Sequence, residues 1–228
     1  MRDFVIPAPH RVVAPVAGGG LFPVRRIFCV GQNYAAHARE MGADPAREPP
    51  FFFTKPADAL VIDGADAPYP SLTKNLHHEI ELVVALGGGG ADIPAAQALD
   101  HVYGYAAGLD LTRRDLQAEA RKAGKPWDMS KSFDCSAPLG LIHPAAQIGH
   151  PRAGRITLKV NETVRQDGDL ADLIWSVPEI VAALSAYVAL APGDLIFTGT
   201  PSGVGPLERG DALVGEIEGV GEVSTRIV

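Results

Sequence analysis

The amino-acid sequence predicts a fold of the α+β class, because its strand patterns outnumber its helical patterns and the two do not alternate regularly. Short apolar runs bounded by glycine or proline recur along the chain, as they do in proteins rich in mixed sheet. The helical patterns are short, and the best of them covers residues 177–190. A length of 228 residues is enough for one sizeable core and does not by itself demand two domains.

Composition and charge restrict the class of partner. With 46% hydrophobic residues, 21% charged residues and a net charge of −7, the chain lacks the basic footprint of a protein that binds nucleic acid or acidic membranes. No apolar run is long enough to span a bilayer. Cys29 and Cys135 are predicted to be free thiols, and Pro7, Pro9 and Pro15 interrupt what would be a signal peptide. We therefore expect a cytoplasmic, soluble protein.

The first third of the chain combines an irregular segment with several strands. Residues 1–24 are rich in proline and glycine and are expected to run extended over the surface, ahead of a single domain at 25–228. The expected elements that follow are a buried strand at 26–31, a short helix within 32–42, and strands at 51–56 and 59–63.

In the rest of the chain, strands and helices are expected in no regular alternation. We expect strands at 75–86 and 103–112, a short helix from Pro94, a polar amphipathic helix at 113–124, a hairpin that turns at Asn161 and Glu162, a helix at 177–190, a strand near 195–199 and a closing hairpin within 212–228.

The stretch "NLHHEIELVVAL" at 75–86 carries the first chemical signal. Glu79 and Glu81 are two residues apart, so on a strand both side chains point to one face. Asp110 stands at the end of another apolar strand. Three carboxylates with room for water describe a Mg²⁺ or Mn²⁺ site rather than a zinc site. The alternatives are a solvated strand face and a helix-capping Asp110, and His77 and His78 could orient a glutamate or simply pack.

Two further groups of polar residues could carry chemistry. His37 and Glu40 are three apart on an expected helix and so share a face, where a carboxylate can make an imidazole a better base. An exposed surface pair is the alternative. Cations and an amide near strand ends could hold a carboxylate or an oxyanion, or could be solvated; these are Lys55, Arg114, Gln117 and Lys131.

In order, the segments "VGQNYAAHAREMG", "FFFTKP", "NLHHEIELVV", "GYAAGLDLTRRDLQ", "PWDMSKSFD", "LKVNETVRQDG" and "GDLIFTGTPSGVGP" resemble the fumarylacetoacetate hydrolase family, most closely its small acylpyruvate hydrolases. The resemblance extends from about Val24 to the C-terminus. It implies a mixed β-sandwich roll with short flanking helices, in a single catalytic domain that forms a homodimer.

The resemblance also implies roles for individual residues. Glu79, Glu81 and Asp110 would bind Mg²⁺, with Mn²⁺ as a substitute. The catalytic residues would be His37, Glu40 and Lys131, and the substrate-binding residues Lys55, Arg114, Gln117, Thr200 and Gln32. At Gln32 the chain departs from the family pattern, which often has arginine there, so the resemblance leaves the exact substrate open.

The activity implied is metal-dependent hydrolysis of the carbon–carbon bond of an acylpyruvate. Fumarylpyruvate, which gives fumarate and pyruvate, is the leading substrate, as in gentisate-type aromatic catabolism. The alternatives are an oxaloacetate decarboxylase and, from another class, a metal-binding protein without catalysis.

Overall fold

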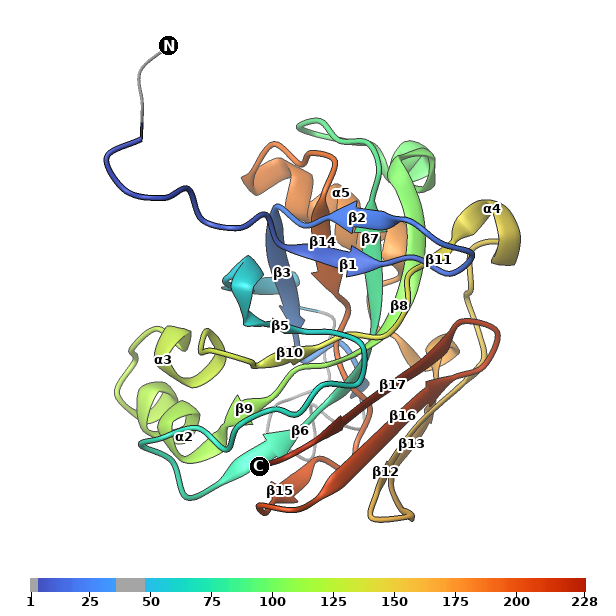
Figure 1. Ribbon diagram of the computed structural model, residues 1–228. Helices are drawn as coiled ribbons and strands as arrows, with labels where there is room; N and C mark the ends of the chain where they lie inside the picture. Colours follow the sequence, from blue (N-terminus) through green and yellow to red (C-terminus); the bar gives the residue numbers. More distant parts are fainter. Residues whose placement is uncertain (1–3, 36–47) are drawn as a thin grey trace.

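The computed structural model describes residues 4–35 and 48–228, and Figure 1 shows how the strands are layered. A six-stranded mixed sheet forms the centre. Only β14 and β3 pair in parallel; the other neighbours are antiparallel. In spatial order its strands are β11 (His143–Pro144), β8 (Val102–Leu109), β7 (Ile80–Leu86), β14 (Asp194–Phe197), β3 (Arg26–Gly31) and β4 (Phe51–Lys55).

A four-stranded antiparallel sheet packs against β7 and β8. It consists of β13 (Thr163–Asp169), β12 (Arg155–Val160), β16 (Ala212–Ile217) and β17 (Gly221–Arg226). Three small sheets complete the strands: β15 (Gly205–Leu207) with β6 (Leu76–His78) and β9 (Thr112–Arg113), β1 (Val13–Pro15) with β2 (Leu21–Pro23), and β10 (Ala137–Pro138) with β5 (Leu60–Val61).

The helices are short and lie outside the sheets (Figure 1). Within residues 4–35 and 48–228 they are α2 (Arg114–Lys122), α3 (Asp128–Lys131), α4 (Ala145–Ile148) and α5 (Val177–Tyr187), with 3₁₀ turns η1 (Ala57–Ala59), η2 (Ala95–His101) and η3 (Leu170–Asp172). A capping box between Ser176 and Glu179 begins α5. No described helix is long and apolar enough to cross a membrane.

The central sheet is buried on both faces, which explains the continuous apolar run in β7. Leu82 and Val84 face a core shared with the four-stranded sheet and α5. Val83 and Ala85 face a second core on the other side of the sheet. Alternate residues of one strand thus fill two different cores. This arrangement confirms the α+β prediction.

The prediction that residues 1–24 run extended over the surface needs a correction at 13–23, whereas residues 4–11 are exposed and form no strand. Residues 13–23 form an antiparallel hairpin rather than a surface extension, and Ala14 and Phe22 are buried in the second core together with Ile27. The glycines at 18–20 adopt positive φ and turn the chain. The apolar residues on either side of this turn then form the buried face of the hairpin. The hairpin is therefore part of the core that residue 25 onwards helps to form.

Most predicted elements lie where the sequence placed them. The strand at 26–31 is confirmed. The hairpin turn at Asn161 and Glu162 is confirmed as well, and both of these residues have positive φ. The expected helix from Pro94 is a 3₁₀ helix, and the long strand 75–86 is interrupted at Glu79. Of the helix expected within 32–42, residues 36–42, which include His37 and Glu40, lie outside the described residues.

Candidate active site

Two neighbouring strands break at the same level, and each break holds a carboxylate. β6 ends before Glu79 and β7 begins after it; β8 ends before Asp110 and β9 begins two residues later. The Asp110 amide donates to the Glu79 carbonyl over 2.8 Å, so the two breaks are joined. The antiparallel pairing of β7 with β8 continues as that of β6 with β9. The kink thereby places both side chains beside Glu81.

Glu79, Glu81 and Asp110 form a buried cluster. One carboxylate oxygen from each lies within 4.8 Å of the other two. All three residues are at most 4% exposed. Burial of three like charges is unfavourable unless positive charge balances them. The predicted grouping of these carboxylates is thus found in the structure.

Three cations supply part of this balance. Lys131 Nζ lies 2.8 Å from Glu79 Oε2 and 2.7 Å from Asp110 Oδ2. Arg114 forms an ion pair with the other oxygen of Glu79, and Lys55 Nζ lies 2.8 Å from Asp110 Oδ1. Burial alone would lower the pKa of Lys131, but Asp110 and Glu79 hold it above its ordinary value.

Glu81 differs from the other two carboxylates. It accepts a hydrogen bond from the Gly199 amide over 2.8 Å, and no described lysine or arginine forms an ion pair with it. Burial, followed by the charges of Asp110 and Glu79, raises the pKa of Glu81 well above its ordinary value. Three converging carboxylate oxygens, one of them from a residue that has no ion pair among the described residues, fit a divalent cation such as Mg²⁺ or Mn²⁺.

The loop after β14 is fixed by Asn33. Its side-chain amide donates to the Thr198 and Trp175 carbonyls over 2.8 and 2.9 Å, and its oxygen accepts from the Trp175 amide. Gly199 has φ +99°, and a Cβ there would lie 2.7 Å from Asn33 Cβ. Only glycine therefore lets this loop approach closely enough to donate to Glu81.

The two adjacent histidines point to different partners. His77 Nε2 lies 3.0 Å from Asn75 Oδ1, and its Nδ1 accepts from Arg114 Nε over 3.4 Å. Burial and the charge of Arg114 lower the pKa of His77 to about 4, so the ring is neutral near pH 7. His77 thus contacts Arg114, which in turn forms an ion pair with Glu79.

His78 belongs to a buried network around Gln166. His78 Nδ1 lies 3.0 Å from Gln166 Oε1, which also accepts from the Ile80 amide. The Gln166 amide donates to Thr200 Oγ1 over 2.8 Å and to the Pro201 carbonyl over 2.9 Å. The network fixes Thr200 at the edge of the site. Gln166 escaped prediction because its strand otherwise shows an exposed pattern.

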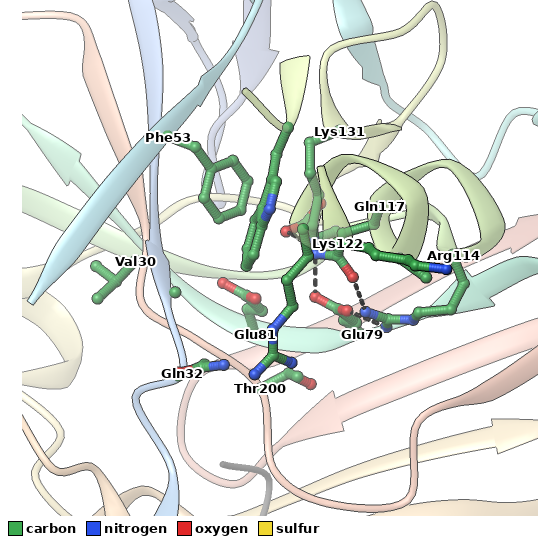
Figure 2. A pocket seen from close by; sticks show the side chains of 15 residues that line it. Val30, Gln32, Phe53, Glu79, Glu81, Arg114, Gln117, Lys122, Lys131 and Thr200 are labelled. Atoms are coloured by element: carbon green, nitrogen blue, oxygen red, sulfur yellow. Dashed lines mark hydrogen bonds and ion pairs between the residues drawn. The ribbon is translucent and has the colours of Figure 1, made fainter. Parts of the chain in front are cut away.

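A cavity of about 440 Å³ opens onto the three carboxylates (Figure 2). Val30, Phe53 and Trp127 form an apolar wall. Of the predicted substrate and catalytic residues, Gln32, Arg114, Gln117, Lys131 and Thr200 line it. Arg121 and Lys122, which the sequence did not single out, line it as well.

Lys55 lies outside the cavity lining. Its side chain is completely buried, and its ammonium group contacts Asp110 and donates to the Leu111 and Lys131 carbonyls over 3.1 and 2.5 Å. This position fits a residue that holds Asp110 in place, in contrast to the substrate contact expected from the sequence. His37 and Glu40 lie outside the described residues, so their pairing stays a prediction.

Comparison with known proteins supplies relatives that span nearly the whole chain. Residues 26–228 match the family model described as fumarylacetoacetate (FAA) hydrolase C-terminal. A crystal structure of fumarylpyruvate hydrolase from Pseudomonas aeruginosa, in complex with Mn²⁺ and pyruvate, is 55% identical, covers 99% of both chains and has a TM-score of 0.97.

Two curated relatives have different names at the same identity. Fumarylpyruvate hydrolase from Ralstonia sp. is 45% identical over 81% of this chain and 95% of its own length. The mitochondrial oxaloacetate tautomerase FAHD1 of Mus musculus is 45% identical over 86% of this chain and 88% of its own length.

Proposed function

This chain belongs to the fumarylacetoacetate hydrolase family, and we propose that it hydrolyses a carbon–carbon bond of an acylpyruvate with the help of a divalent metal ion. The observation that carries the proposal is the buried carboxylate cluster of Glu79, Glu81 and Asp110 at the inner end of a cavity lined by cations. Fumarylpyruvate is the proposed substrate, because two similar proteins are fumarylpyruvate hydrolases.

The metal site is proposed to take Mg²⁺, with Mn²⁺ as a substitute. Glu79, Glu81 and Asp110 would hold the ion through carboxylate oxygens. A divalent ion there supplies positive charge that orients the 2-keto acid end of the substrate and stabilises negative charge on it.

Donor groups beside the carboxylates suit the carbonyl that is attacked. Gln117 Oε1 accepts a hydrogen bond from Arg114, so the group that Gln117 can offer to a substrate is its N–H donor. Lys131 lines the same cavity and has an ammonium group. In our proposal these donors stabilise the oxyanion that forms at C4 when hydroxide adds to it.

The attacking water needs a base, and His37 is our proposal for it, oriented by Glu40. His37 takes a proton from water as the oxygen bonds to C4. The C3–C4 bond then breaks, and its electron pair leaves with C3 as the enolate of pyruvate, which is protonated. Fumarate is the other product, so atoms and charge balance.

A substrate panel tests the proposal. Purified protein is assayed with fumarylpyruvate, acetylpyruvate and oxaloacetate, first with Mg²⁺ or Mn²⁺ and then with EDTA. We expect metal-dependent release of pyruvate from fumarylpyruvate. Full activity in EDTA would contradict metal dependence, and an enzyme active on oxaloacetate alone would contradict the hydrolase assignment.

Action on oxaloacetate is the second candidate, favoured by the similarity to FAHD1. Decarboxylation needs no activated water, whereas acylpyruvate hydrolysis does. We therefore expect His37→Ala to reduce acylpyruvate hydrolysis by roughly 100-fold or more while any oxaloacetate decarboxylation survives far better. Glu40→Ala should show the same pattern more weakly. Equal loss of both activities would remove His37 from the hydrolytic step.

We also infer a cytoplasmic homodimer that acts in aromatic catabolism of the gentisate type. The dimer and the pathway rest on the family resemblance alone. Sedimentation of the purified protein tests the dimer, which a monomer at working concentration would contradict.

A further inference from the structure

Helix α2 presents a row of side chains to the cavity. The cavity-lining residues of this helix are Arg114, Gln117, Ala118, Arg121 and Lys122, at positions i, i+3, i+4, i+7 and i+8. This spacing follows one face of an α-helix. The row begins next to the carboxylate cluster and ends at the last turn of the helix.

The two ends of this row are in different environments. Arg114 is buried and is engaged by Glu79 and Gln117. Arg121 and Lys122 are exposed and line the same cavity farther out. Seven residues separate Arg114 from Arg121, which corresponds to about 10 Å along the helix axis. The outer end of the cavity therefore contains two cations that the reaction as proposed does not use.

Among the described residues, the wall opposite α2 is apolar. Val30 and Phe53 lie across the cavity from Gln117 and Arg114 (Figure 2), and Trp127 lines the cavity with them. A planar unsaturated chain can pass between such a wall and α2. An anionic group at its far end would then reach Arg121 and Lys122.

The charge of the whole cavity points the same way. Among its described lining residues, the cations Arg114, Arg121, Lys122 and Lys131 outnumber three carboxylates by one. A divalent ion at the carboxylates adds two more positive charges. Such a cavity favours a substrate with more than one negative charge.

We propose that Arg121 and Lys122 form a subsite for a carboxylate at the far end of the acyl group, so that the preferred acylpyruvates are dicarboxylates. This inference rests on the proposed function, because it places the pyruvoyl end at Glu79, Glu81 and Asp110. In fumarylpyruvate, about 7 Å separates the two carboxyl carbons, given C–C bonds of about 1.5 Å. That length is comparable with the span of α2 between the inner and outer groups.

The test pairs two substitutions with two substrates. Arg121→Gln, Lys122→Gln and the double variant are assayed with fumarylpyruvate and with its distal methyl ester, which keeps the length and removes the charge. We expect KM for fumarylpyruvate to rise about tenfold in each single variant and about 100-fold in the double variant, with kcat nearly unchanged. The ester should have a high KM in wild type and show little further change in the variants.

Lys125→Gln is the matched control, since Lys125 is an exposed lysine just beyond α2 and lies outside the cavity lining. Its KM values should equal those of wild type. Unchanged KM in the double variant, or equal increases for acid and ester, would overturn the subsite. A wild-type enzyme that cleaves neither compound would instead overturn the proposed function, and the subsite assignment with it.

Discussion

The inner and outer ends of the cavity are both rich in charged side chains, but the charges are arranged differently. At the inner end, Glu79 and Asp110 share Lys131, and all three are buried. At the outer end, Arg121 and Lys122 are exposed to solvent and carry charge of one sign. Water screens the outer charges, whereas the inner ones depend on each other.

This difference indicates where function and stability are coupled. Removing one member of a buried ion pair leaves its partner buried and uncompensated, at a cost of about 3–5 kcal/mol. Removing an exposed charge costs little stability. Substitutions in the inner ion pairs should therefore change activity and folding together, and outer ones should change substrate affinity alone.

The largest effect is expected at the carboxylates, where two isosteric substitutions should both reduce activity but should differ in their effect on stability. Asp110→Asn and Glu81→Gln should each reduce kcat by on the order of 10³-fold, because each removes charge stabilisation of several kcal/mol at about 1.4 kcal/mol per tenfold. In EDTA, Asp110→Asn should also destabilise the protein by about 3–5 kcal/mol, since Lys55 loses its ion pair with Asp110 and Lys131 keeps only its ion pair with Glu79.

Glu81→Gln should leave metal-free stability unchanged or higher. It removes a carboxylate that forms no ion pair with a described cation. Burial and the neighbouring carboxylates already raise the pKa of this group, so its charged form is unfavourable without metal. Urea unfolding in EDTA measures both variants. Equal destabilisation of the two variants would mean that Asp110 and Glu81 do not differ in ion pairing as the structure indicates.

The next largest effect is expected at Lys131. Lys131→Met should reduce turnover by on the order of 100-fold or more if the ammonium group stabilises an oxyanion. It should also lower metal-free stability, since Glu79 and Asp110 would face each other without it. Added Mn²⁺ should then raise Tm more in the variant than in wild type.

Lys159→Met is the control, because Lys159 is exposed on β12. A Lys131→Met enzyme with near-normal turnover would return this lysine to a structural role. A Tm response to Mn²⁺ no larger than that of wild type would show that Lys131 does not balance the two carboxylates.

The sequence predicted much of the inner end and little of the outer end, for a physical reason. A pair of glutamates on an otherwise apolar strand is unusual enough to stand out, so Glu79 and Glu81 were found from the residues alone. Arg121 and Lys122 occur on a polar helix where solvated cations are common. Only the path of α2 along the cavity distinguishes them.

Other residues depended on contacts that are distant in the chain. Lys55 was expected at the substrate, but its partner Asp110 is 55 residues away and the pairing is buried. The sequence did not predict the N-terminal hairpin, because its apolar segments are short and form a buried face only when Phe22 packs on the central sheet. The strand break at Glu79 likewise follows from pairing with β9 and β15.

A moderate effect is expected from Gln166, which positions Thr200 without lining the cavity. Gln166→Met should lower kcat/KM about tenfold and destabilise the protein by about 1–3 kcal/mol, because buried polar groups lose their partners. Nitrogen NMR of the His78 ring distinguishes positioning from general loosening. Gln166 Oε1 accepts from the Ile80 amide, so it can only accept from His78, which must carry its proton on Nδ1. Detection of the Nε2-protonated tautomer in wild type would contradict this network.

The smallest effect is expected at Asp115, which anchors the first turn of α2 and so affects both ends of the cavity. Its carboxylate accepts from the Thr73 hydroxyl over 2.5 Å and from the Lys74 and Leu116 amides over 2.9 Å. Burial alone would raise the pKa of Asp115, but these hydrogen bonds bring it below its ordinary value.

A lowered pKa in the folded state means that the ionised group stabilises the protein above its unfolded pKa of about 3.9, and that this contribution is lost as pH falls through the folded value. Asp115→Asn should therefore lower the free energy of unfolding at neutral pH, by less than about 1 kcal/mol because the group is largely in contact with water. The gap to wild type should close as pH falls below about 4. Urea titrations of both proteins across this range measure the gap. A gap that stays constant with pH would show that the hydrogen bonds to Asp115 do not depend on its charge, and that α2 is anchored by packing against its neighbours instead.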